Sequence, residues 1–337
     1  MALFLVTGGC GFIGSSLAHA LVAGGDRVRI VDNLSTGRLG NVASLLRDHP
    51  SQVELWRGEL TDTDLLDQAL VGVDFILHHA AIPSVPWSID HPFDCERINT
   101  HGTLQLLEAA RRNGRIRRLV FAASCAAYGD LDPDKPKRES DLPVPLSPYA
   151  ISKLAGEHLC AVYSRIHSVP AVALRYFNVF GPRQDPSSHY AAAIPRFICA
   201  ALGGQPPTLF GDGLQSRDFV FVENIIQANL LACQADAAQV SGQVINIGGG
   251  KGLALLEVIG MLGELLGREI RPTHEPARPG EVRHSFADIA KAGALLGYQP
   301  RVAFRDGLAQ TVKWYRENRP QPNPAPKSES TQMGTSR

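Results

Sequence analysis

The sequence has no excess of either charge, no metal-binding cysteine pattern and no long apolar run. Its 33 basic and 33 acidic residues give a formal net charge of zero, so the overall charge favours neither nucleic acid nor an anionic membrane as a partner. The six cysteines are scattered, without a Cys-x-x-Cys pair or a zinc-ligand spacing. This argues against a metal centre and favours reduced thiols. No apolar run approaches the ~18 residues that a membrane span needs.

The start of the chain also lacks a targeting segment. Residues 1–6 lead directly into a glycine-rich motif, which leaves no room for a signal peptide. We therefore expect a cytoplasmic protein. With 337 residues, of which 44% are hydrophobic, the chain can bury a large core and form one or two domains.

The glycine-rich motif at the start of the chain predicts a dinucleotide site. Residues 3–6 form an apolar run typical of a strand, and residues 12–23 show helical periodicity. Between them, Gly8 permits a tight turn, Gly11 lets the backbone approach a pyrophosphate, and Gly14 allows the helix to pack closely. A lone glycine trio can also be a flexible loop. The strand before it and the helix after it favour the dinucleotide interpretation, with the phosphates at the helix N-terminus.

An acidic residue supports the same interpretation and indicates which dinucleotide is bound. A second predicted strand, residues 27–31, ends in Asp32, which lies 18 residues beyond Gly14. A carboxylate there can accept hydrogen bonds from the adenosine ribose, and it would repel a 2′-phosphate. We therefore expect NAD rather than NADP.

Further strands and helices alternate along the chain. Strands alternating with helices predict a doubly wound parallel sheet of the Rossmann type, with ligands beyond the carboxyl ends of the strands. The predicted strands are residues 53–56, 73–78, 119–122 and 172–175, and the predicted helices are 63–71, 103–113 and 148–166. His78 and His79 lie in this region without a second ligand cluster nearby, so we interpret them as packing residues.

A tyrosine and a lysine four residues apart are candidate catalytic groups. Ser147 and Pro148 are suited to the cap and first turn of a helix, which places Tyr149 and Lys153 on one helical face. An ammonium beside a phenol favours the phenolate, a base that can act near neutral pH. Such a pair also occurs by chance on surface helices. Ser124, at the end of a predicted strand, is the third candidate.

The rhythm of strands and helices breaks after residue 175, where proline and glycine become frequent. We predict an NAD-binding Rossmann domain of residues 1–175, joined by about 217–248, which return to it. A smaller α/β domain of residues 176–216 and 249–318 is predicted to bind the substrate. The tail, residues 319–337, is rich in proline and polar residues and is expected to be disordered.

At this point the sequence resembles the extended short-chain dehydrogenase/reductases, and within them the nucleotide-sugar epimerases, above all the UDP-N-acetylglucosamine and UDP-glucose 4-epimerases. The resemblance extends from Leu3 to about Arg316. It rests on motifs along the whole of this span: Thr7 to Gly14, Asp32-Asn33, His79-Ala80-Ala81, Asn99, Ser124 to Gly129, Tyr149-x-x-x-Lys153, Arg175 to Pro182, Gly211-Asp212-Gly213, Arg217-Asp218-Phe219 and Arg278 to Ser285.

The resemblance implies a role for each matching residue. Ser124, Tyr149 and Lys153 would be catalytic. Tightly retained NAD would contact Gly8, Gly11, Phe12, Ile13, Gly14, Asp32, Asn33, Glu59, Leu60, Ala80, Ala81, Asn99, Tyr149, Lys153 and Tyr176. The UDP-sugar would contact Ser84, Ser124, Asn178, Arg217, Arg278 and Ser285. Without the resemblance, the two arginines could equally form surface salt bridges. No metal is expected.

The implied reaction is epimerisation at C4 of the sugar. Tyr149, as phenolate, would take the proton of the C4 hydroxyl while hydride passes to NAD, and the 4-keto sugar would turn and take the hydride back on its other face. Lys153 would lower the pKa of the tyrosine and hold the nicotinamide ribose. Ser124 would hydrogen-bond the C4 oxygen.

Small details of the sequence separate this reaction from related ones. The interval from Ser124 to Tyr128 contains no carboxylate, whereas the related 4,6-dehydratases and decarboxylases carry acids there. Ser285 matches a position beside the C2 substituent, where a small residue leaves room for an N-acetyl group. Glu59, in place of a usual aspartate near the adenine, and Trp87 depart from the pattern and could alter binding.

UDP-GlcNAc/UDP-GalNAc is therefore the expected substrate pair, with UDP-Glc/UDP-Gal as a second pair. Two alternatives stay open: epimerisation of another UDP-sugar, such as UDP-glucuronate or a pentose, and a non-catalytic NAD-binding protein of the same fold. Relatives pair through two helices from each subunit, so we expect a homodimer formed by residues 100–112 and 152–166.

Overall fold

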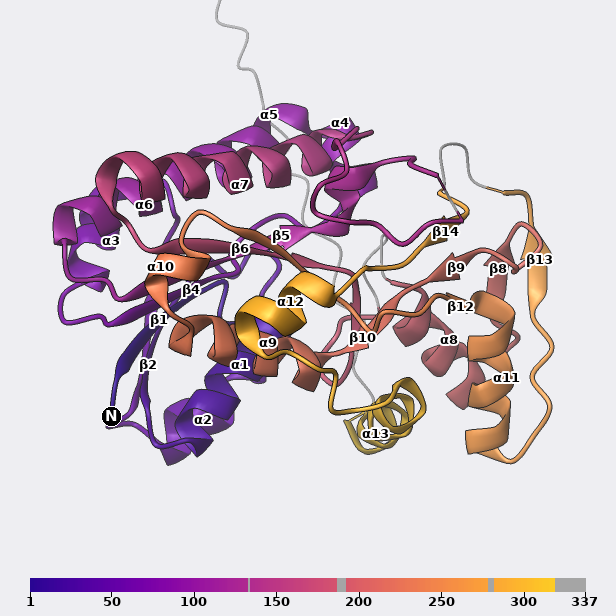
Figure 1. Cartoon of the computed structure of the whole chain (residues 1–337). Helices are drawn as coiled ribbons and strands as arrows, with labels where there is room; N and C mark the ends of the chain where they lie inside the picture. The colour runs from indigo at the N-terminus through magenta and orange to yellow at the C-terminus, as the bar shows by residue number, and fades with distance from the viewer. Residues whose placement is uncertain (133, 187–191, 278–281, 319–337) are drawn as a thin grey trace, which may run out of the picture.

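A computed structural model describes residues 1–132, 134–186, 192–277 and 282–318 and shows an α/β protein built on a seven-stranded sheet (Figure 1). The sheet order is β3-β2-β1-β4-β5-β6-β11, and every neighbouring pair of strands is parallel. The strands are β1 (Leu3–Thr7), β2 (Arg27–Asp32), β3 (Val53–Arg57), β4 (Phe75–His78), β5 (Arg118–Ser124), β6 (Ala171–Tyr176) and β11 (Val244–Ile247). The predicted Rossmann-type sheet is thus confirmed.

The central strands are buried and mostly apolar because helices cover both faces of the sheet. Every residue of β1 is buried, as is every residue of β4 and β6. The strand order reverses at β1, with β2 on one side and β4 on the other. This reversal opens a crevice at the carboxyl ends of the strands, where ligands of such sheets bind.

Two groups of helices form the outer layers of the sheet. One face carries α3 (Thr63–Ala69), α6 (Gly102–Asn113) and α7 (Pro148–His167), which lie above the sheet in Figure 1. The other carries α1 (Phe12–Ala23), α2 (Ala43–Asp48), α9 (Val222–Gln234), α10 (Ala237–Val240) and α12 (Ala290–Leu296). Between β4 and α6 the chain forms α4 (Val85–Asp90), α5 (Pro92–Cys95) and a π-helical turn, Glu96–His101. Short 3-10 turns, Leu39–Asn41 and Cys125–Tyr128, complete this part.

The remaining elements surround a separate cluster of buried residues, which includes Phe180, Phe197, Phe221, Leu262 and Leu308. Its helices are α8 (Ala193–Leu202), α11 (Leu255–Leu266) and α13 (Phe304–Asn318). Its strands are β7 (Asn178–Phe180), β8 (Thr208–Phe210), β9 (Ser216–Arg217), β10 (Phe219–Phe221), β12 (Leu253–Ala254), β13 (Thr273–Glu275) and β14 (His284–Ser285). They form three small sheets: β10-β7, β12-β9-β14 and β13-β8.

The segment 217–248, which we assigned to the cofactor domain, is shared between the two regions. Its strand β10 pairs with β7 and not with the seven-stranded sheet, whereas β11 joins that sheet and α9 packs against α1. The domain boundaries stay a prediction. The predicted tail lies outside the described residues. Within the described ranges, no helix has both the length and the apolar character to cross a membrane.

Candidate active site

The turn between β1 and α1 approaches the rest of the backbone so closely that it has no room for side chains. Gly8 has φ of +66°, and a methyl group there would lie 2.7 Å from the amide nitrogen of Ala80. A methyl group at Gly14 would overlap the carbonyl oxygen of Gly8. At Gly11 it would lie 3.2 Å from the same oxygen. The bare backbone at the start of α1, called the glycine cradle below, is thus of the kind that can receive an anionic group, and the cofactor contact here stays a prediction.

Asp32 closes one side of this cradle at the carboxyl end of β2. Its Oδ2 accepts a hydrogen bond from the amide of Cys10 at 2.9 Å, and its Oδ1 accepts one from Leu34 at 2.8 Å. The side chain is largely buried, and Gly37 packs against the carboxylate. Two amides thus fix the carboxylate and leave lone pairs for ribose hydroxyls. Asn33 beside it caps its own turn, accepting from the amide of Ser35.

Glu59, the departure noted in the sequence, points toward an arginine. Its carboxylate pairs with Arg97 Nη1 at 3.1 Å and accepts a longer bond from Thr61 at 3.3 Å. Both charged side chains are about half exposed, at 48%. The neighbouring Leu60 is buried and packs against Gly102. The longer acid therefore lies at the rim of the crevice, where a cofactor would have to share it with Arg97.

Asn99 organises the loop after β4 rather than facing open space. It lies on the π-helical turn, a distortion frequent at functional sites. Its Oδ1 accepts from the amide of Ile82 at 2.8 Å, and its Nδ2 donates to Ser152 Oγ at 3.1 Å. The loop that carries Ala80 and Ala81 is thereby fixed to α7, the helix of the candidate catalytic residues. The side chain of Asn99 serves the protein itself, and a cofactor contact through it stays a prediction.

Tyr176 and the two histidines belong to buried hydrogen-bond networks. The hydroxyl of Tyr176 bonds with Asn229 at 2.8 Å and with His79 Nε2 at 3.0 Å. His78 bonds with Thr7 and Thr103 through its two ring nitrogens. These contacts fit the interpretation of both histidines as packing residues. A contact between Tyr176 and the cofactor stays a prediction.

The three candidate catalytic residues lie at the junction of β5 and α7. Ser147 caps α7 by accepting from the amide of Ala150 at 3.2 Å, and Ser88 of α4 accepts from the amide of Tyr149 at 3.1 Å. The sequence interpretation missed Ser88, because only the fold brings α4 to the start of α7. Lys153 Nζ lies 6.0 Å from the centre of the Tyr149 ring. Tyr149 in turn shares a hydrogen bond with Ser124.

Without cofactor, burial dominates the electrostatics of this junction. Burial raises the pKa of Tyr149 to about 12, and the hydrogen bond with Ser124 opposes this only in part. Burial lowers the pKa of Lys153 to about 8. Its ammonium donates to the carbonyl oxygen of Ala122 at 2.8 Å. A lowering of the tyrosine pKa by Lys153, which would oppose burial, stays a prediction.

Three of the predicted substrate residues lie close together on adjoining short strands. Asn178 begins β7, Arg217 ends β9, and Ser285 ends β14 in register with Arg217. Asn178 Oδ1 is buried without a hydrogen-bond partner within the described structure. A buried polar atom left in this state favours a ligand as its partner. Arg278 lies outside the described residues.

Ser84 is the remaining predicted substrate residue, and it already has one hydrogen bond within the protein. It is the cap of α4, and its Oγ accepts from the amide of Trp87 at 3.1 Å. The hydroxyl hydrogen of Ser84 is still available to a ligand. The ring of Trp87 lies against His91 in a tilted arrangement, at 4.7 Å between ring centres.

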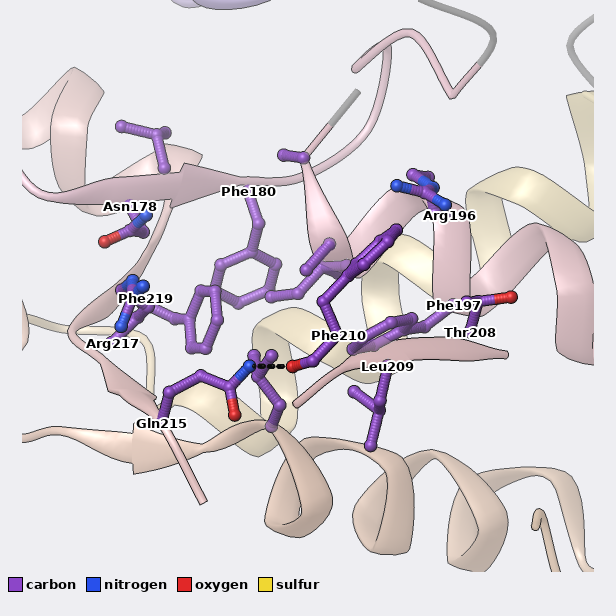
Figure 2. A pocket seen from close by; sticks show the side chains of 15 residues that line it. Asn178, Phe180, Arg196, Phe197, Thr208, Leu209, Phe210, Gln215, Arg217 and Phe219 are labelled. Atoms are coloured by element: carbon purple, nitrogen blue, oxygen red, sulfur yellow. Dashed lines mark hydrogen bonds between the residues drawn. The ribbon is translucent and has the colours of Figure 1, made fainter. Parts of the chain in front are cut away.

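A pocket of about 300 Å³ adjoins Asn178 and Arg217 (Figure 2). Aromatic rings of Phe180, Phe210 and Phe219 extend into it, and Arg196 lies at its other end, 5.9 Å from the Phe210 ring centre. The sequence interpretation missed these aromatic residues, although the quoted Gly211-Asp212-Gly213 motif adjoins Phe210. The arrangement combines flat apolar walls with a guanidinium at each end, which suits a planar base that carries an anionic group.

Asp218 holds the strands of this region together. Its buried carboxylate accepts from the backbone amides of Gly249, Gly250 and Ala287 at 2.6, 2.9 and 3.1 Å. Its own amide donates to the carbonyl oxygen of Ser285, and its carbonyl oxygen accepts from the amide of Asn178. The residue thus connects β7, β9 and β14, which carry the three described substrate candidates.

Comparison with known proteins identifies the family to which the chain belongs. Residues 4–248 match the family model described as the NAD dependent epimerase/dehydratase family. The chain belongs to this family. It is 35% identical over 319 residues to the putative UDP-glucose 4-epimerase of Methanocaldococcus jannaschii, covering 94% of this chain and 99% of that one.

Solved structures of the same family share the fold along nearly the whole chain. A UDP-N-acetylglucosamine 4-epimerase from Methanobrevibacter ruminantium, in complex with UDP-N-acetylmuramic acid, is 36% identical with a TM-score of 0.86, covering 94% of this chain and 98% of that one. A UDP-glucuronic acid 4-epimerase from Bacillus cereus, in complex with UDP-glucuronic acid and NAD, is 36% identical with a TM-score of 0.84, covering 94% and 99%.

The cofactor expected from the sequence is that of the epimerase/dehydratase family, and the residues present fit it. The family is NAD-dependent, and the glycine cradle leaves space for a pyrophosphate where any side chain would clash. Asp32 is fixed beside that cradle, as a contact to ribose hydroxyls requires.

Proposed function

We propose that this protein epimerises C4 of a UDP-hexose. UDP-GlcNAc/UDP-GalNAc is the favoured substrate pair, and UDP-Glc/UDP-Gal is the second. The observation that carries the proposal is the grouping of Tyr149, Ser124 and Lys153 where β5 ends, at the same edge of the sheet as the glycine turn after β1. Fold alone does not specify this chemistry, because many activities share it. The three side chains at this junction support it.

The chemistry of each side chain follows from its contacts. NAD, when bound, accepts and returns hydride at C4. Tyr149 takes the proton of the C4 hydroxyl and gives it back from the same phenol oxygen. Ser124, already hydrogen-bonded to Tyr149, donates to the C4 oxygen and holds it beside the phenol. Lys153 supplies the positive charge that favours the phenolate and a donor for the nicotinamide ribose.

The UDP part of the substrate is assigned to the pocket between β7, β8 and β9. The phenylalanine rings form walls for the uracil, Arg217 faces the diphosphate, and the unpartnered Asn178 Oδ1 marks a polar contact. The volume of this pocket, about 300 Å³, is at the lower end of the range for ligand sites. The sugar then extends from Arg217 toward Tyr149.

Two features favour simple epimerisation of an acetylated sugar. The turn after Ser124 consists of Cys125, Ala126, Ala127 and Tyr128 and offers no acid for an elimination or decarboxylation. Ser285, in register with Arg217, is small and half-buried, which leaves space beside the sugar. If the two hexose pairs together are the first candidate, UDP-glucuronate is the second candidate, supported by the likeness to the Bacillus cereus enzyme.

A homodimer is also proposed, formed through α7 and its neighbours. The outer face of α7 exposes Ile151, Val162 and Ile166 at 52%, 45% and 67%. Ile89 and Phe93, on α4 and α5 beside it, are also exposed. An apolar stripe at helical spacing on an outermost helix suits a matching helix of a second subunit.

The test uses purified protein without added cofactor. UDP-GlcNAc, UDP-Glc and UDP-glucuronate are incubated separately, and inversion at C4 is followed by proton NMR. Formation of UDP-GalNAc supports the proposal together with retained NAD. Turnover of UDP-glucuronate alone moves the assignment to the second candidate. No turnover of any of them, even with NAD added, contradicts it and leaves another UDP-sugar or a non-catalytic protein.

A separate substitution tests the preference for the acetylated sugar. Ser285→Tyr fills the space beside the C2 substituent, so UDP-GlcNAc turnover is lost while UDP-Glc turnover persists. Equal loss on both substrates would show that Ser285 does not set the choice.

A further inference from the structure

A buried ion pair between Glu157 and Arg175 lies one helical turn beyond the catalytic lysine. Arg175 of β6 donates from Nε to Glu157 Oε1 at 2.7 Å and from Nη2 to Glu157 Oε2 at 2.6 Å. Their side chains are only 4% and 2% exposed. A buried pair of this kind is weak evidence for stability, because desolvation of both charges offsets their attraction. Its place in the fold indicates another role.

Glu157 stands between two positive charges. It follows Lys153 by one turn of α7, so the two side chains lie on the same helical face. On its other side it holds the guanidinium of Arg175, which also lies over the Tyr128 ring, 4.6 Å from the ring centre. The order of charges is ammonium, carboxylate, guanidinium, all shielded from water.

We propose that Glu157 keeps Lys153 in its ammonium form, and that Arg175 keeps Glu157 from taking the proton of the lysine. The pair thereby determines the pH range in which the site carries the positive charge beside Tyr149. Glu157 and Arg175 are positioning residues in this sense, since neither has a contact with the reacting atoms. The proposal rests on the proposed function only where it connects Lys153 to Tyr149.

No other group around Lys153 can replace the carboxylate, as far as the described residues show. Burial lowers the pKa of the histidines on β4 far below neutrality, so they carry no charge, and it raises the pKa of the neighbouring thiol and phenol, so they carry none either. The groups that face Lys153 are Tyr149 and Glu157 of α7, His78 and His79 at the end of β4, and Cys95 of α5; Arg175 of β6 lies behind Glu157.

Arg175 is needed because burial works against the charge on Glu157. Burial raises the pKa of Glu157, and the two hydrogen bonds from Arg175 oppose that rise. Without the guanidinium, a proton shared between Lys153 and Glu157 could leave both neutral. The bidentate contact holds the carboxylate ionised and therefore available to the lysine.

The experiment titrates Lys153 directly, in the full-length protein with its bound cofactor and no substrate. The chain has only seven lysines, so protein labelled with ¹³C at lysine Cε gives few signals, and Lys153→Met assigns the one of interest. Glu157→Gln removes the anion and leaves the guanidinium. The double variant E157Q/R175Q removes both charges and keeps two amides that can bond to each other.

The titration midpoint of the Lys153 ammonium should fall by about one pH unit or more in Glu157→Gln. A unit charge one helical turn away has an effect of that order even at an effective dielectric constant of about 20. In the double variant it should return part of the way. The descending limb of kcat at high pH should move with the midpoint. The matched control is Glu54→Gln, which breaks the contact between Glu54 and Arg29 Nε at the far edge of the sheet and should leave Lys153 unchanged.

An unchanged midpoint in Glu157→Gln, with only lowered kcat or stability, would overturn the proposal and leave the pair a structural one. If Glu157→Gln does not fold, the double variant decides, because its midpoint should still lie below that of the wild type. A midpoint that moves as expected in a protein that turns over none of the UDP-sugars would instead contradict the proposed function alone.

Discussion

Replacing Lys153 with methionine tests how the site makes a base out of a buried phenol. The ammonium nitrogen lies 6.0 Å from the centre of the Tyr149 ring. At an effective dielectric constant of about 20, a unit charge at that distance favours the phenolate by about 3 kcal/mol, or about two pKa units. Lys153→Met should therefore lower kcat at pH 7 by about 100-fold from this term alone.

The pH profile separates this electrostatic role from a loss of structure. With NAD bound, the ascending limb of kcat should move up by about two pH units in Lys153→Met. C4 inversion followed by proton NMR between pH 6 and 10 measures it. Lys137→Met is the control, because Lys137 is equally buried and also donates to a backbone carbonyl, that of Asp132. A Lys153→Met profile with the limb unmoved would refute the electrostatic argument.

The same substitution should also change how the free energy of unfolding depends on pH, in a direction that the pKa of Lys153 predicts. The pKa of Lys153 is lowered from 10.5 to about 8 on folding, so between these values the unfolded chain binds more protons and stability rises with pH. Below pH 8 the buried ammonium costs up to about 3 kcal/mol. Lys153→Met should lack this pH slope in the free energy of unfolding and be at least as stable at pH 7, as measured by urea denaturation.

Three further predictions follow from the packing. Gly14→Ala should lose its bound NAD, because the methyl group overlaps the turn, whereas Gly40→Ala, whose methyl meets nothing within 4 Å, should retain it; the nucleotide released on denaturation measures this. In Asp218→Asn the side-chain amide cannot accept from all three backbone amides, so the strands that carry the substrate candidates lose about one charge-assisted hydrogen bond. KM for the UDP-sugar should therefore rise ~10–100-fold, with kcat little changed. Ile166→Glu should give monomers in sedimentation velocity, whereas Leu142→Glu, at a residue that lies outside α7 and is still more exposed, should not.

The parts of the fold that depend on neighbours in sequence were predictable. The glycine turn and α1 were predictable because strand, glycines and helix follow one another within 23 residues. Ser147 and Pro148 likewise specify where α7 begins, and the structure has it there. Errors are small and lie at ends: β4 begins at Phe75 rather than at residue 73, and α3 ends at Ala69 rather than at 71.

The parts that depend on distant residues were not predictable. The amides that hold Asp218 come from Gly249, Gly250 and Ala287, more than 30 residues away. Phe210 gives no periodic signal that distinguishes a pocket wall from a core residue. Such contacts exist only once the chain has folded.

The high pKa of Tyr149 has a consequence for how the site works. A phenol with a pKa of about 12 stays protonated at neutral pH, so a base at this position needs an interaction that opposes burial. The same burial that suppresses ionisation also keeps the dielectric low, which makes each positive charge brought near the ring more effective than it would be in water. Lys153, now bonded to the carbonyl of Ala122, is one such charge. Positive charge close to Tyr149 is therefore what a base at this position requires, and the Lys153→Met profile measures how much of it the lysine supplies.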